Sequence, residues 1–220
     1  MKPHFPAALL VLSLGVTAHA DDAADIDAAR RFATPMLGKP CLFTENTAGD
    51  LADANHVYRL KYRYPGQGQD EPDNTLTLVQ LLCSAGAYNS TSVYITKDPA
   101  SGEFRLLSFA EPKLDYDYTD ESFTTLTGPP RVVGYRTRVE LINSSYDPAT
   151  MSISATVKWR SQGDAWSSGV WSFTEGEFVL NHYDVDPTYD LASDGSNKTD
   201  PAPDQSYQIY PEVKLMTRIR

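Results

Sequence analysis

The strict alternation of side-chain polarity over residues 151–160 constrains the fold more than any other feature of this sequence. Apolar residues occupy every second position, and polar residues fill the positions between them. Because successive side chains of a β-strand point to opposite faces, this pattern predicts a strand with one face in the core. Residues 135–141 alternate in a similar way, and the connection at 143–150 contains turn-forming residues. We therefore expect the two strands to form a hairpin.

Residues 171–180 predict a second hairpin. Glu175-Gly176 suits a two-residue turn, because such turns need positive φ angles, which glycine adopts readily. This turn sets a register in which Phe173 lies opposite Phe178. The hairpin therefore gains an aromatic and apolar patch on one face.

Four further segments have the composition of strands and are separated by turn-forming residues. They span residues 58–64, 75–83, 93–96 and 104–107, of which the last two are expected to form a third hairpin. The one convincing helix is at residues 26–37. Short strands at this regular spacing predict an all-β fold, an antiparallel sandwich or a partly closed barrel built of hairpins, with one short N-terminal helix.

Residues 1–20 have the pattern of a secretory signal peptide. Lys2 precedes a short apolar run, and small residues lead to a cleavage point after Ala20. The apolar run is too short to span a bilayer, and no cysteine stands near the cleavage point to carry a lipid, so no membrane anchor is expected. We predict an exported bacterial protein, periplasmic or secreted, whose mature chain begins at Asp21.

The rest of the chain is expected to form one domain followed by a tail. Its size and its share of hydrophobic residues, 41% of the whole sequence, suffice for one core. Residues 184–208 are rich in Asp, Pro, Ser and Gly and are expected to be mobile. Alternation at 213–219 is that of a last strand. The predicted organisation is a signal peptide (1–20), a single β-rich domain (21–190) and an acidic flexible tail with a possible last strand (191–220).

The chain is acidic, and its charge limits the classes of partner. The formal net charge of −10 becomes −11 when the signal peptide, which carries Lys2 and no acid, is removed. Nucleic acid is excluded as a partner, because its phosphates need clustered Lys and Arg. A basic protein would be steered toward such a surface. A net negative charge also keeps exported proteins soluble, so the charge alone does not require a basic partner.

Cys41 and Cys83 are the two cysteines of the chain, and in an exported protein they are expected to form a disulfide. Closing the loop between them would stabilise the fold by about 4 kcal/mol on chain-entropy grounds. The alternative is a metal site or a catalytic thiol. It is less favoured, because two cysteines cannot complete a zinc site and neither has a histidine nearby.

Small residues fill positions 84–87, directly after Cys83. They allow another backbone or the disulfide to lie close, and Gly86 permits a bulge or a turn where the strand ends. Tyr88 is then expected to enter the core, and Asn89 to stabilise the turn by bonding its own backbone. The functional alternative is that Tyr88 and Asn89 line a binding groove.

Four phrases of the sequence follow one another in an order that a known family also has. They are residues 82–89, 141–150, 160–164 and 171–180, and the Gly-Ala-Tyr-Asn phrase in the first is the most specific. On these phrases the chain resembles the bacterial domain-of-unknown-function family 1176, over roughly residues 30–190. The resemblance implies an exported, cysteine-containing protein and implies no particular chemistry.

The chain departs from this family at two positions. The family usually has a cysteine where this chain has Ala165, and a second cysteine is expected near Tyr189. The resemblance therefore implies that one disulfide of the family is missing here and that the bridge from Cys41 to Cys83 is the remaining one. It also implies that residues 166–189 are looser than in relatives.

No residue pattern in the sequence specifies a reaction. After the signal peptide the histidines are His56 and His182, and no Gly-x-Ser-x-Gly, His-Glu-x-x-His or phosphate-binding glycine loop occurs. We therefore expect a protein that is not an enzyme, with no catalytic residue, no metal site and no cofactor. The acidic phrase at 115–121 offers carboxylates to calcium, but it lacks the glycine and the spaced glutamate of an EF-hand loop. A solvated loop is favoured there.

All three tryptophans of the chain lie within residues 159–171, together with Arg160. Aromatic rings and arginine are the side chains that most often anchor partners. Alternation predicts that Trp159 and Trp171 are in the core. Trp166 lies in a polar segment and is expected to be exposed. Arg160 and Trp166 therefore join Tyr88 and Asn89 as candidate binding residues.

These observations favour an exported envelope protein that acts by binding. The expected role is that of an inhibitor or immunity-type factor acting on a protein partner, a basic protein of the envelope. The alternative is a carbohydrate-directed binding module or hydrolase of the cell envelope, which needs clustered carboxylates and exposed aromatic residues in one cleft. A third interpretation is a purely structural envelope protein.

Overall fold

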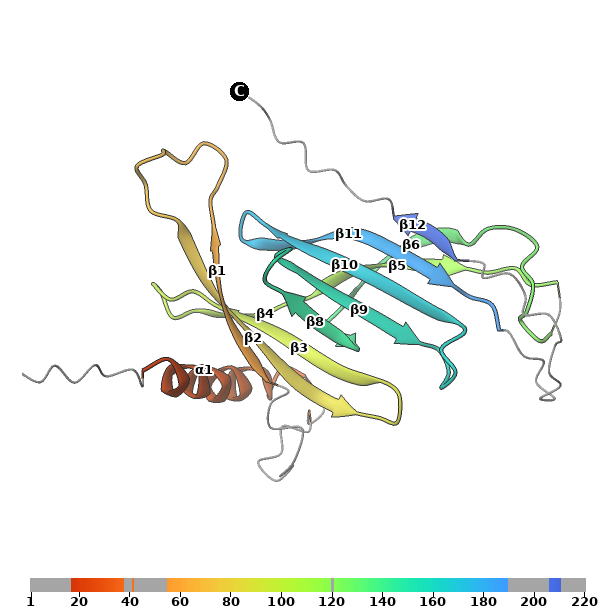
Figure 1. Ribbon diagram of the computed structural model, residues 1–220, viewed down its shortest axis with the longest axis horizontal. Helices are drawn as coiled ribbons and strands as arrows, with labels where there is room; N and C mark the ends of the chain where they lie inside the picture. The colour runs from red at the N-terminus through yellow and green to blue at the C-terminus, as the bar shows by residue number, and fades with distance from the viewer. Residues whose placement is uncertain (1–16, 38–40, 42–54, 120, 190–205, 211–220) are drawn as a thin grey trace, which may run out of the picture.

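The described residues fold into two antiparallel β-sheets that share one core, with a separate two-stranded ribbon and one helix (Figure 1). The computed structural model describes residues 17–37, 41, 55–119, 121–189 and 206–210. Every strand pair in these residues is antiparallel. Of the two predicted all-β architectures, the sandwich is the one that fits.

The first sheet combines consecutive hairpins with one strand from later in the chain. Its strands are β1 (His56–Tyr62), β2 (Asn74–Ala85), β3 (Ser90–Lys97), β4 (Phe104–Leu106) and β7 (Glu140–Ile142), of which β7 pairs with β3. The predicted third hairpin is confirmed, because Ile95 on β3 lies opposite Leu106 on β4. The register between β2 and β3 shifts between Leu82 and Ser84, before the small-residue segment, whereas Gly86, where a bulge or a turn was expected, lies in a turn just after the end of β2.

The second sheet has the order β12-β11-β10-β9-β8. Its strands are β8 (Ser144–Asp147), β9 (Ser152–Lys158), β10 (Trp166–Thr174), β11 (Glu177–Asp186) and β12 (Tyr207–Tyr210). The predicted hairpin of β10 and β11 is confirmed in its register, with Phe173 opposite Phe178. Its turn residues Glu175 and Gly176 have φ angles of 53° and 90°. A two-residue turn with positive φ at both positions matches the twist of the flanking strands.

The hairpin predicted for residues 135–141 and 151–160 is wrong. β9 pairs with β8, with Asp147 opposite Ser152. The predicted partner is divided between two other strands, β6 (Arg131–Arg138), which pairs with β5 (Phe109–Asp115), and β7, which joins the first sheet. The alternating pattern at 135–141 identifies strand conformation but does not select a partner. Residues 143–150, predicted to be a turn-rich connection, contain β8, and β8 is the strand that pairs with β9.

The helix α1 (Thr17–Ala33) lies against the first sheet (Figure 1). It begins and ends earlier than the predicted helix at 26–37. It ends before Pro35, because a residue that precedes proline is disfavoured in the helical conformation. Asp25 of α1 accepts hydrogen bonds from Arg59 at 2.9 Å and from Lys97 at 2.8 Å, which ties the helix to β1 and β3.

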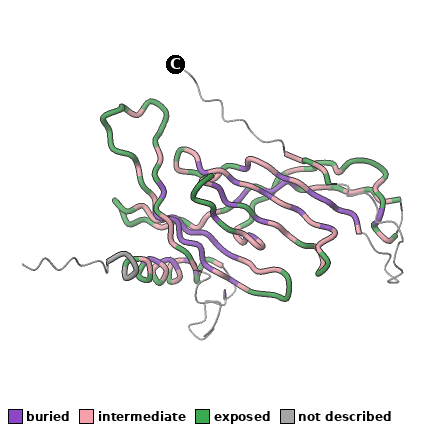
Figure 2. Tube along the Cα trace, in the orientation of Figure 1, coloured by how far each residue is buried: buried purple, intermediate pink, exposed green. Residues whose placement is uncertain are grey.

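The first sheet is buried on both faces, and this gives the protein two apolar clusters. Alternate residues of β2 and β3 pack toward α1, with Ala29, Ala33, Cys41, Val79, Leu81, Cys83, Val93 and Ile95 as the buried members. The residues between them face the main cluster, which contains Leu78 and Tyr94 together with side chains of the second sheet. Figure 2 shows buried positions along the middle of both sheets and exposed positions in the loop between β1 and β2.

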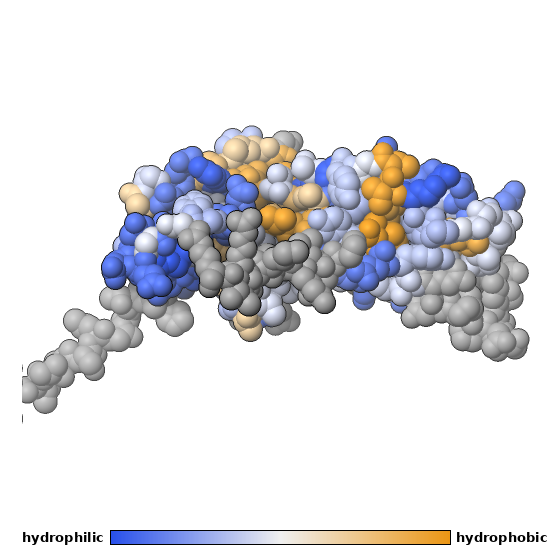
Figure 3. All heavy atoms as spheres, turned by 90° about the horizontal axis from the view of Figure 1, so that it is seen from above, coloured by the Kyte–Doolittle hydropathy of each residue, from blue (hydrophilic) through white to orange (hydrophobic). Residues whose placement is uncertain are grey.

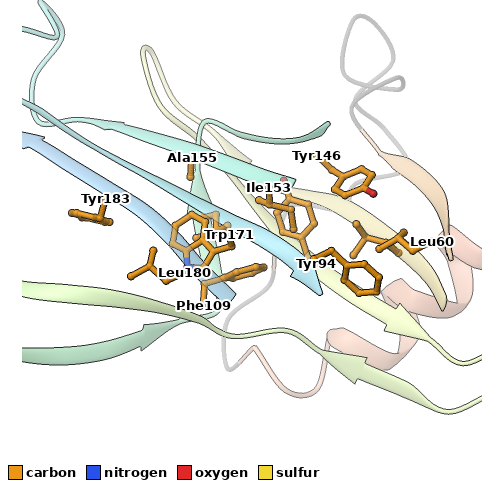
Figure 4. Packing of buried hydrophobic residues seen from close by; sticks show 12 residues of the cluster. Leu60, Tyr94, Phe109, Tyr146, Ile153, Ala155, Trp171, Leu180 and Tyr183 are labelled. Atoms are coloured by element: carbon orange, nitrogen blue, oxygen red, sulfur yellow. The ribbon is translucent and has the colours of Figure 1, made fainter. Parts of the chain in front are cut away.

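The main cluster is centred on aromatic rings from three parts of the chain (Figure 4). Trp171 of β10 contacts the ring of Phe109 on β5, with centroids 5.4 Å apart, and its Nε1 donates to the carbonyl oxygen of Ala110 at 2.9 Å. Trp171 is therefore in the core, as predicted. Gly169 makes this placement possible, because a Cβ at that position would lie 2.6 Å from the indole ring.

The predicted start of the mobile segment, at residue 184, is too early in the chain. β11 continues to Asp186, and Asp186 and Thr188 are buried, with the Asp186 carboxylate accepting bonds from the Thr188 amide and hydroxyl at 3.0 and 2.6 Å. β12 lies within the predicted tail. The possible last strand at 213–219 is outside the described residues and stays a prediction. No helix among the described residues is long and apolar enough to cross a membrane.

Candidate functional site

The predicted disulfide between Cys41 and Cys83 is present. It joins the segment after α1 to β2, on the face of the first sheet that packs against the helix. Glu140 lies near both sulfur atoms. Because the sulfurs are bonded to each other, they are not available as the thiolates that a zinc site requires.

Asn89 lies at the junction of the two sheets and not only in its own turn. Its Nδ2 donates to the carbonyl oxygen of Lys158 on β9 at 2.8 Å, and its Oδ1 accepts from Nδ2 of Asn143 at 2.7 Å. The turn itself is closed by the Gly86 amide, which donates to the Asn89 carbonyl at 2.8 Å. The expectation that the Asn89 side chain bonds its own backbone is therefore wrong. The side chain has a structural role between β3 and β9.

Tyr88 does not enter the core as predicted, since 42% of its surface is exposed. Trp166 shows the opposite error, because it is partly buried where exposure was expected. It begins β10, and its pairing with Lys158 on β9 and Asp186 on β11 holds it inside the sheet. The polar residues around Trp166 indicated a loop, whereas β10 begins at Trp166 itself.

Arg160 is held by two neighbours within the fold. It makes two hydrogen bonds to the carboxylate of Asp164, one of them at 2.8 Å, and its guanidinium lies 4.4 Å from the ring centroid of Tyr189. This cation–π contact joins the two segments in which the resemblance implied a missing disulfide. The implied looseness of residues 166–189 stays a prediction. Trp159 is partly buried against Tyr116 and not in the core, which corrects the prediction for this residue.

The structure brings the four candidate binding residues near the same end of β9, and whether they bind a partner stays a prediction. Asn89 bonds to Lys158, and Lys158 pairs with Trp166, so these residues lie near the same end of β9. None of Tyr88, Asn89, Arg160 and Trp166 lines the cavities described below. Asn89 bonds between the two sheets, Trp166 pairs within the second sheet, and Arg160 contacts Asp164 and Tyr189.

A cleft of about 450 Å³ lies elsewhere, between the tips of two hairpins. One side comes from the β10–β11 turn and the other from the β3–β4 hairpin together with the end of β1. The residues that line it are Tyr62, Tyr64, Leu76, Thr96, Asp98, Glu103, Arg105, Leu106, Leu107, Ser108, Glu175, Gly176, Glu177 and Phe178. Four carboxylates thus face one arginine, and we call this hollow the acidic cleft.

The position of the β10–β11 turn against β1 creates this cleft. A Cβ at Gly176 would lie 3.0 Å from the ring of Tyr62, so the glycine lets the turn approach the tyrosine closely. Tyr62 also contacts Phe173 edge to face, with centroids 5.6 Å apart. The hairpin that the sequence predicts correctly thereby places Glu175 and Glu177 beside an aromatic side chain of the other sheet.

Tyr62 and Tyr64 form an aromatic pair in the cleft. Their rings meet edge to face with centroids 5.3 Å apart, and their hydroxyl oxygens are 3.4 Å apart. The hydrogen bond to Tyr64, with a smaller contribution from burial, raises the pKa of Tyr62 to about 12, so the phenol stays neutral. Tyr64 is 53% exposed, so much of its side chain remains accessible in the cleft.

The acids of the cleft lie in different local environments. Backbone amides of Ala100 and Ser101 donate to the Asp98 carboxylate, and the first of these bonds mainly lowers its pKa. Oε1 of Glu103 lies 3.6 Å from Nε of Arg105, and both side chains are largely exposed. Glu175 and Glu177 are also exposed, at the turn of the neighbouring hairpin. The cleft therefore brings four acidic side chains together with one arginine.

A second polar group lies inside the fold, around Glu111 of β5. Its carboxylate accepts bonds from Arg136 at 2.9 and 3.1 Å, from Arg138, and from the Tyr183 hydroxyl at 3.2 Å. Burial raises the pKa of Glu111, but the bonds from the two arginines outweigh this effect and hold its pKa below the usual value. The adjoining cavity of about 20 Å³ has room for about one water molecule. The carboxylate of Glu111, the two arginines and the tyrosine thus form a structural ion cluster with little open space beside it.

Two carboxylates of the acidic phrase at 115–121 are already engaged. Arg131 lies 2.7 Å from a carboxylate oxygen of Asp115 and 3.2 Å from one of Asp117. Asp120 lies outside the described residues. The described part of this phrase therefore gives no support to a calcium site.

Sequence reasoning missed the acidic cleft, although most of its residues lie in predicted strands and turns that the structure contains. The turn residues Glu175-Gly176 and the strand with Tyr62 were each identified from local pattern. That the β10–β11 tip meets β1 and the β3–β4 tip depends on packing between sheets. Figure 3 shows that hydrophilic surface covers much of the face seen from above, with apolar residues in separate areas.

Comparison with known proteins identifies one family. The profile of a family described as "Protein of unknown function (DUF1176)" matches residues 61–201. This range includes most of both sheets and the acidic cleft. No curated protein and no solved structure matches the chain.

Proposed function

Because the chain belongs to the DUF1176 family of proteins of unknown function, whose description names no activity, we propose a function from its surface chemistry. The protein is an exported, non-catalytic binding factor that holds a basic protein of the envelope at the acidic cleft. The observation that carries this proposal is the excess of Asp98, Glu103, Glu175 and Glu177 over Arg105 in one hollow. The disulfide agrees with an oxidising compartment.

The cleft suits a protruding Lys or Arg side chain better than a neutral surface. A cation that enters it would meet carboxylates from two hairpin tips, and the ring of Tyr64 would contribute a cation–π contact. Each exposed charge pair contributes at most about 1 kcal/mol. Several pairs in one hollow, with the negative charge of the whole chain, favour fast association with a basic protein. An inhibitor or immunity-type factor would use the cleft in this way.

The second candidate function is binding or hydrolysis of envelope carbohydrate, and the tyrosines favour it. Tyr62 and Tyr64 place aromatic surface beside carboxylates in one cleft, which is the combination that this alternative requires. Trp166, which the sequence predicted to be an exposed aromatic residue, does not line the cleft. The tyrosine pair is thus the specific observation behind this candidate.

The test is a pull-down from an envelope extract of the source organism with one cleft variant, a double substitution, and a matched control. Glu103→Gln/Glu177→Gln removes one carboxylate from each side of the cleft. Glu71→Gln/Glu121→Gln removes the same number of charges from residues that do not line it. We expect a stoichiometric basic protein to bind the unmodified chain and the control and to bind the cleft variant about tenfold more weakly, since two lost pairs amount to about 1.4 kcal/mol.

Salt and sugar separate the two candidate functions. Binding of a basic protein should be lost near 1 M salt, where the Debye length falls to about 3 Å. Titration with soluble peptidoglycan fragments should give no heat if the protein-partner function is correct. Salt-resistant binding of these fragments that is lost in Tyr64→Ala would replace it with the carbohydrate function. Equal binding by the cleft variant and the control would remove the cleft from both proposals.

A further inference from the structure

The ribbon of β5 and β6 has one open edge. In the described part of the chain β6 pairs with β5 alone, and no backbone hydrogen bond from another element reaches it there. Every residue of β6 except Gly134 is exposed, and Tyr135 is 58% exposed. An unpaired strand edge is a template for the addition of another strand.

A β-bulge divides this edge into two parts. Gly134 and Val132 lie opposite consecutive residues of β5, so Val133 between them is the extra residue of the bulge. A bulge twists an edge away and so protects it from further pairing. The regular part of the edge therefore runs from Gly134 to the end of β6.

The regular part of the ribbon has two faces of different chemistry, because residues that lie opposite each other share a face. Arg136 lies opposite Glu111, and Arg138 points to the same face and contacts the same carboxylate. The other face carries Tyr135 opposite Pro112 and Thr137 opposite Ala110. The edge of β6 is therefore cationic on one face and uncharged on the other.

The arginine face holds more positive than negative charge. Arg136 and Arg138 share the carboxylate of Glu111, and their side chains are 49% and 43% exposed. Lys113 lies on the same face, opposite Gly134, and is exposed. This excess is local, since the whole chain has a formal net charge of −10. A strand that matches this edge needs acidic side chains on the arginine face.

The uncharged face leads into a hollow of about 400 Å³ at the end of β6. Thr137 and Val139, which alternate with the arginines, line this hollow together with the apolar side chains of Met36, Leu37 and Leu106. An apolar side chain at the end of an added strand would be removed from water there, which favours its binding.

We propose that the edge of β6 from Gly134 to Arg138, together with this hollow, is a docking site for a strand of a partner protein in which acidic and apolar residues alternate. The acidic side chains face the two arginines, and the apolar ones cover Tyr135 and end in the hollow. Main-chain hydrogen bonds provide the pairing, and the alternation selects the partner. No residue of β6 lines the acidic cleft, so the inference does not depend on the proposed function.

The first experiment is a fluorescence-anisotropy titration of the mature full-length chain with a dye-labelled peptide, Leu-Glu-Val-Glu-Val-Glu. In an antiparallel register its glutamates lie level with Arg138, Arg136 and Gly134, beyond which lies Lys113, and its leucine reaches the hollow. The reordered peptide Leu-Val-Val-Glu-Glu-Glu should bind at least about tenfold more weakly, because it cannot match both faces. Serine in place of the leucine should weaken binding about tenfold, because the hollow is then not filled.

The second experiment compares two variants. Lys113→Glu/Tyr135→Ala changes one exposed residue on each face of the edge. Lys61→Glu/Tyr88→Ala is the matched control, with the same charge reversal and the same truncation at exposed residues elsewhere. The alternating peptide should bind the control as tightly as the unmodified chain and should bind Lys113→Glu/Tyr135→Ala at least about tenfold more weakly.

Hydrogen exchange tests the strand pairing itself and needs no variant. With saturating peptide, the outward-facing amides of residues 134–138 should exchange at least about tenfold more slowly than in the free chain. Docking through side chains alone would leave these amides unchanged.

Four results would each overturn the inference: no binding of the alternating peptide at about 1 mM, binding of either control peptide equal to it, equal binding by the two variants, or unchanged exchange at saturation. The cleft variant Glu103→Gln/Glu177→Gln should bind the peptide no more weakly than the unmodified chain, and weaker binding would place the peptide in the cleft instead. Loss of the basic partner in the pull-down would reject the proposed function and leave these measurements unaffected.

Discussion

Replacement of Asn143 by alanine should destabilise the protein more than any other single asparagine substitution that we consider. Asn143 lies between β7 of the first sheet and β8 of the second, where the chain passes from one sheet to the other. Its Oδ1 accepts from the Ser90 amide at 2.8 Å, and its Nδ2 donates to Oδ1 of Asn89 at 2.7 Å and to the Thr156 carbonyl at 3.0 Å. The residue has a φ of 45°.

These contacts give the expected magnitude. Three hydrogen bonds between partly buried groups contribute about 1 kcal/mol each. Alanine at a left-handed φ adds about 1 kcal/mol of backbone strain, which asparagine tolerates better. Asn143→Ala should therefore lower the free energy of unfolding by about 4 kcal/mol. Asn143→Gly, which adopts positive φ freely, should lose about 3 kcal/mol through the hydrogen bonds alone.

Urea unfolding under oxidising conditions, followed by the fluorescence of the buried Trp171, measures these values. With a slope of about 2.5 kcal/mol/M, the midpoint of Asn143→Ala should fall by about 1.5 M. Asn74→Ala is the control, because Asn74 makes one side-chain bond, to Gln67 at 3.0 Å, and should lose about 1 kcal/mol or less. A loss below about 1 kcal/mol in Asn143→Ala would refute the role of Asn143 as a junction, and equal loss in the glycine variant would refute the contribution of strain.

Four further predictions concern other parts of the fold. Cys41→Ser/Cys83→Ser should lower the free energy of unfolding by about 4 kcal/mol, read from the urea midpoint, and an unchanged midpoint would contradict the entropic argument. Gly169→Ala should cost about 1–3 kcal/mol in thermal unfolding, because its Cβ would lie 2.6 Å from Trp171, whereas Gly128→Ala, with no atom within 4 Å, should be nearly neutral. Because the pKa of Glu111 is lowered from 4.5, its stabilisation is present above that value and is lost as the pH falls through the lower folded value; Glu111→Gln should cost about 2 kcal/mol at pH 7, and the difference from the unmodified protein should shrink below about pH 4.5. A pH-independent difference between the two proteins would be inconsistent with this reasoning. Intact-mass measurement of the exported protein should place its N-terminus at Asp21, and a chain that retains Met1 would contradict the signal peptide.

The local elements of this protein were predictable because their determinants are adjacent in the sequence. The β10–β11 hairpin is fixed by Glu175-Gly176, which needs positive φ angles, and by alternation on either side, so that even the pairing of Phe173 with Phe178 was correct. The β3–β4 hairpin follows in the same way. The disulfide was predictable for another reason, since Cys41 and Cys83 have only each other as partners.

The errors concern residues whose environment comes from distant parts of the chain. Alternation at 135–141 did not reveal that β6 pairs with β5 while β7 crosses to the first sheet. Tyr88 was predicted to be in the core and is exposed, whereas Trp166 was predicted to be exposed and is partly buried. Burial depends on which strand lies alongside a residue. Asn89 was assigned to its own turn, yet its side chain bonds to β9, far along the sequence.

The sequence by itself determined the all-β class, two of the three predicted hairpins with their turns and the disulfide, because turn chemistry and side-chain alternation act over a few residues. The tertiary structure alone decided the crossing at Asn143 and the meeting of the hairpin tips that forms the acidic cleft. At the crossing, Asn143 bonds to Ser90, Asn89 and Thr156, and at the cleft Tyr62 of the first sheet packs against Phe173 of the second. Such packing depends on the shapes of side chains brought together from distant segments, and a linear pattern does not contain that information.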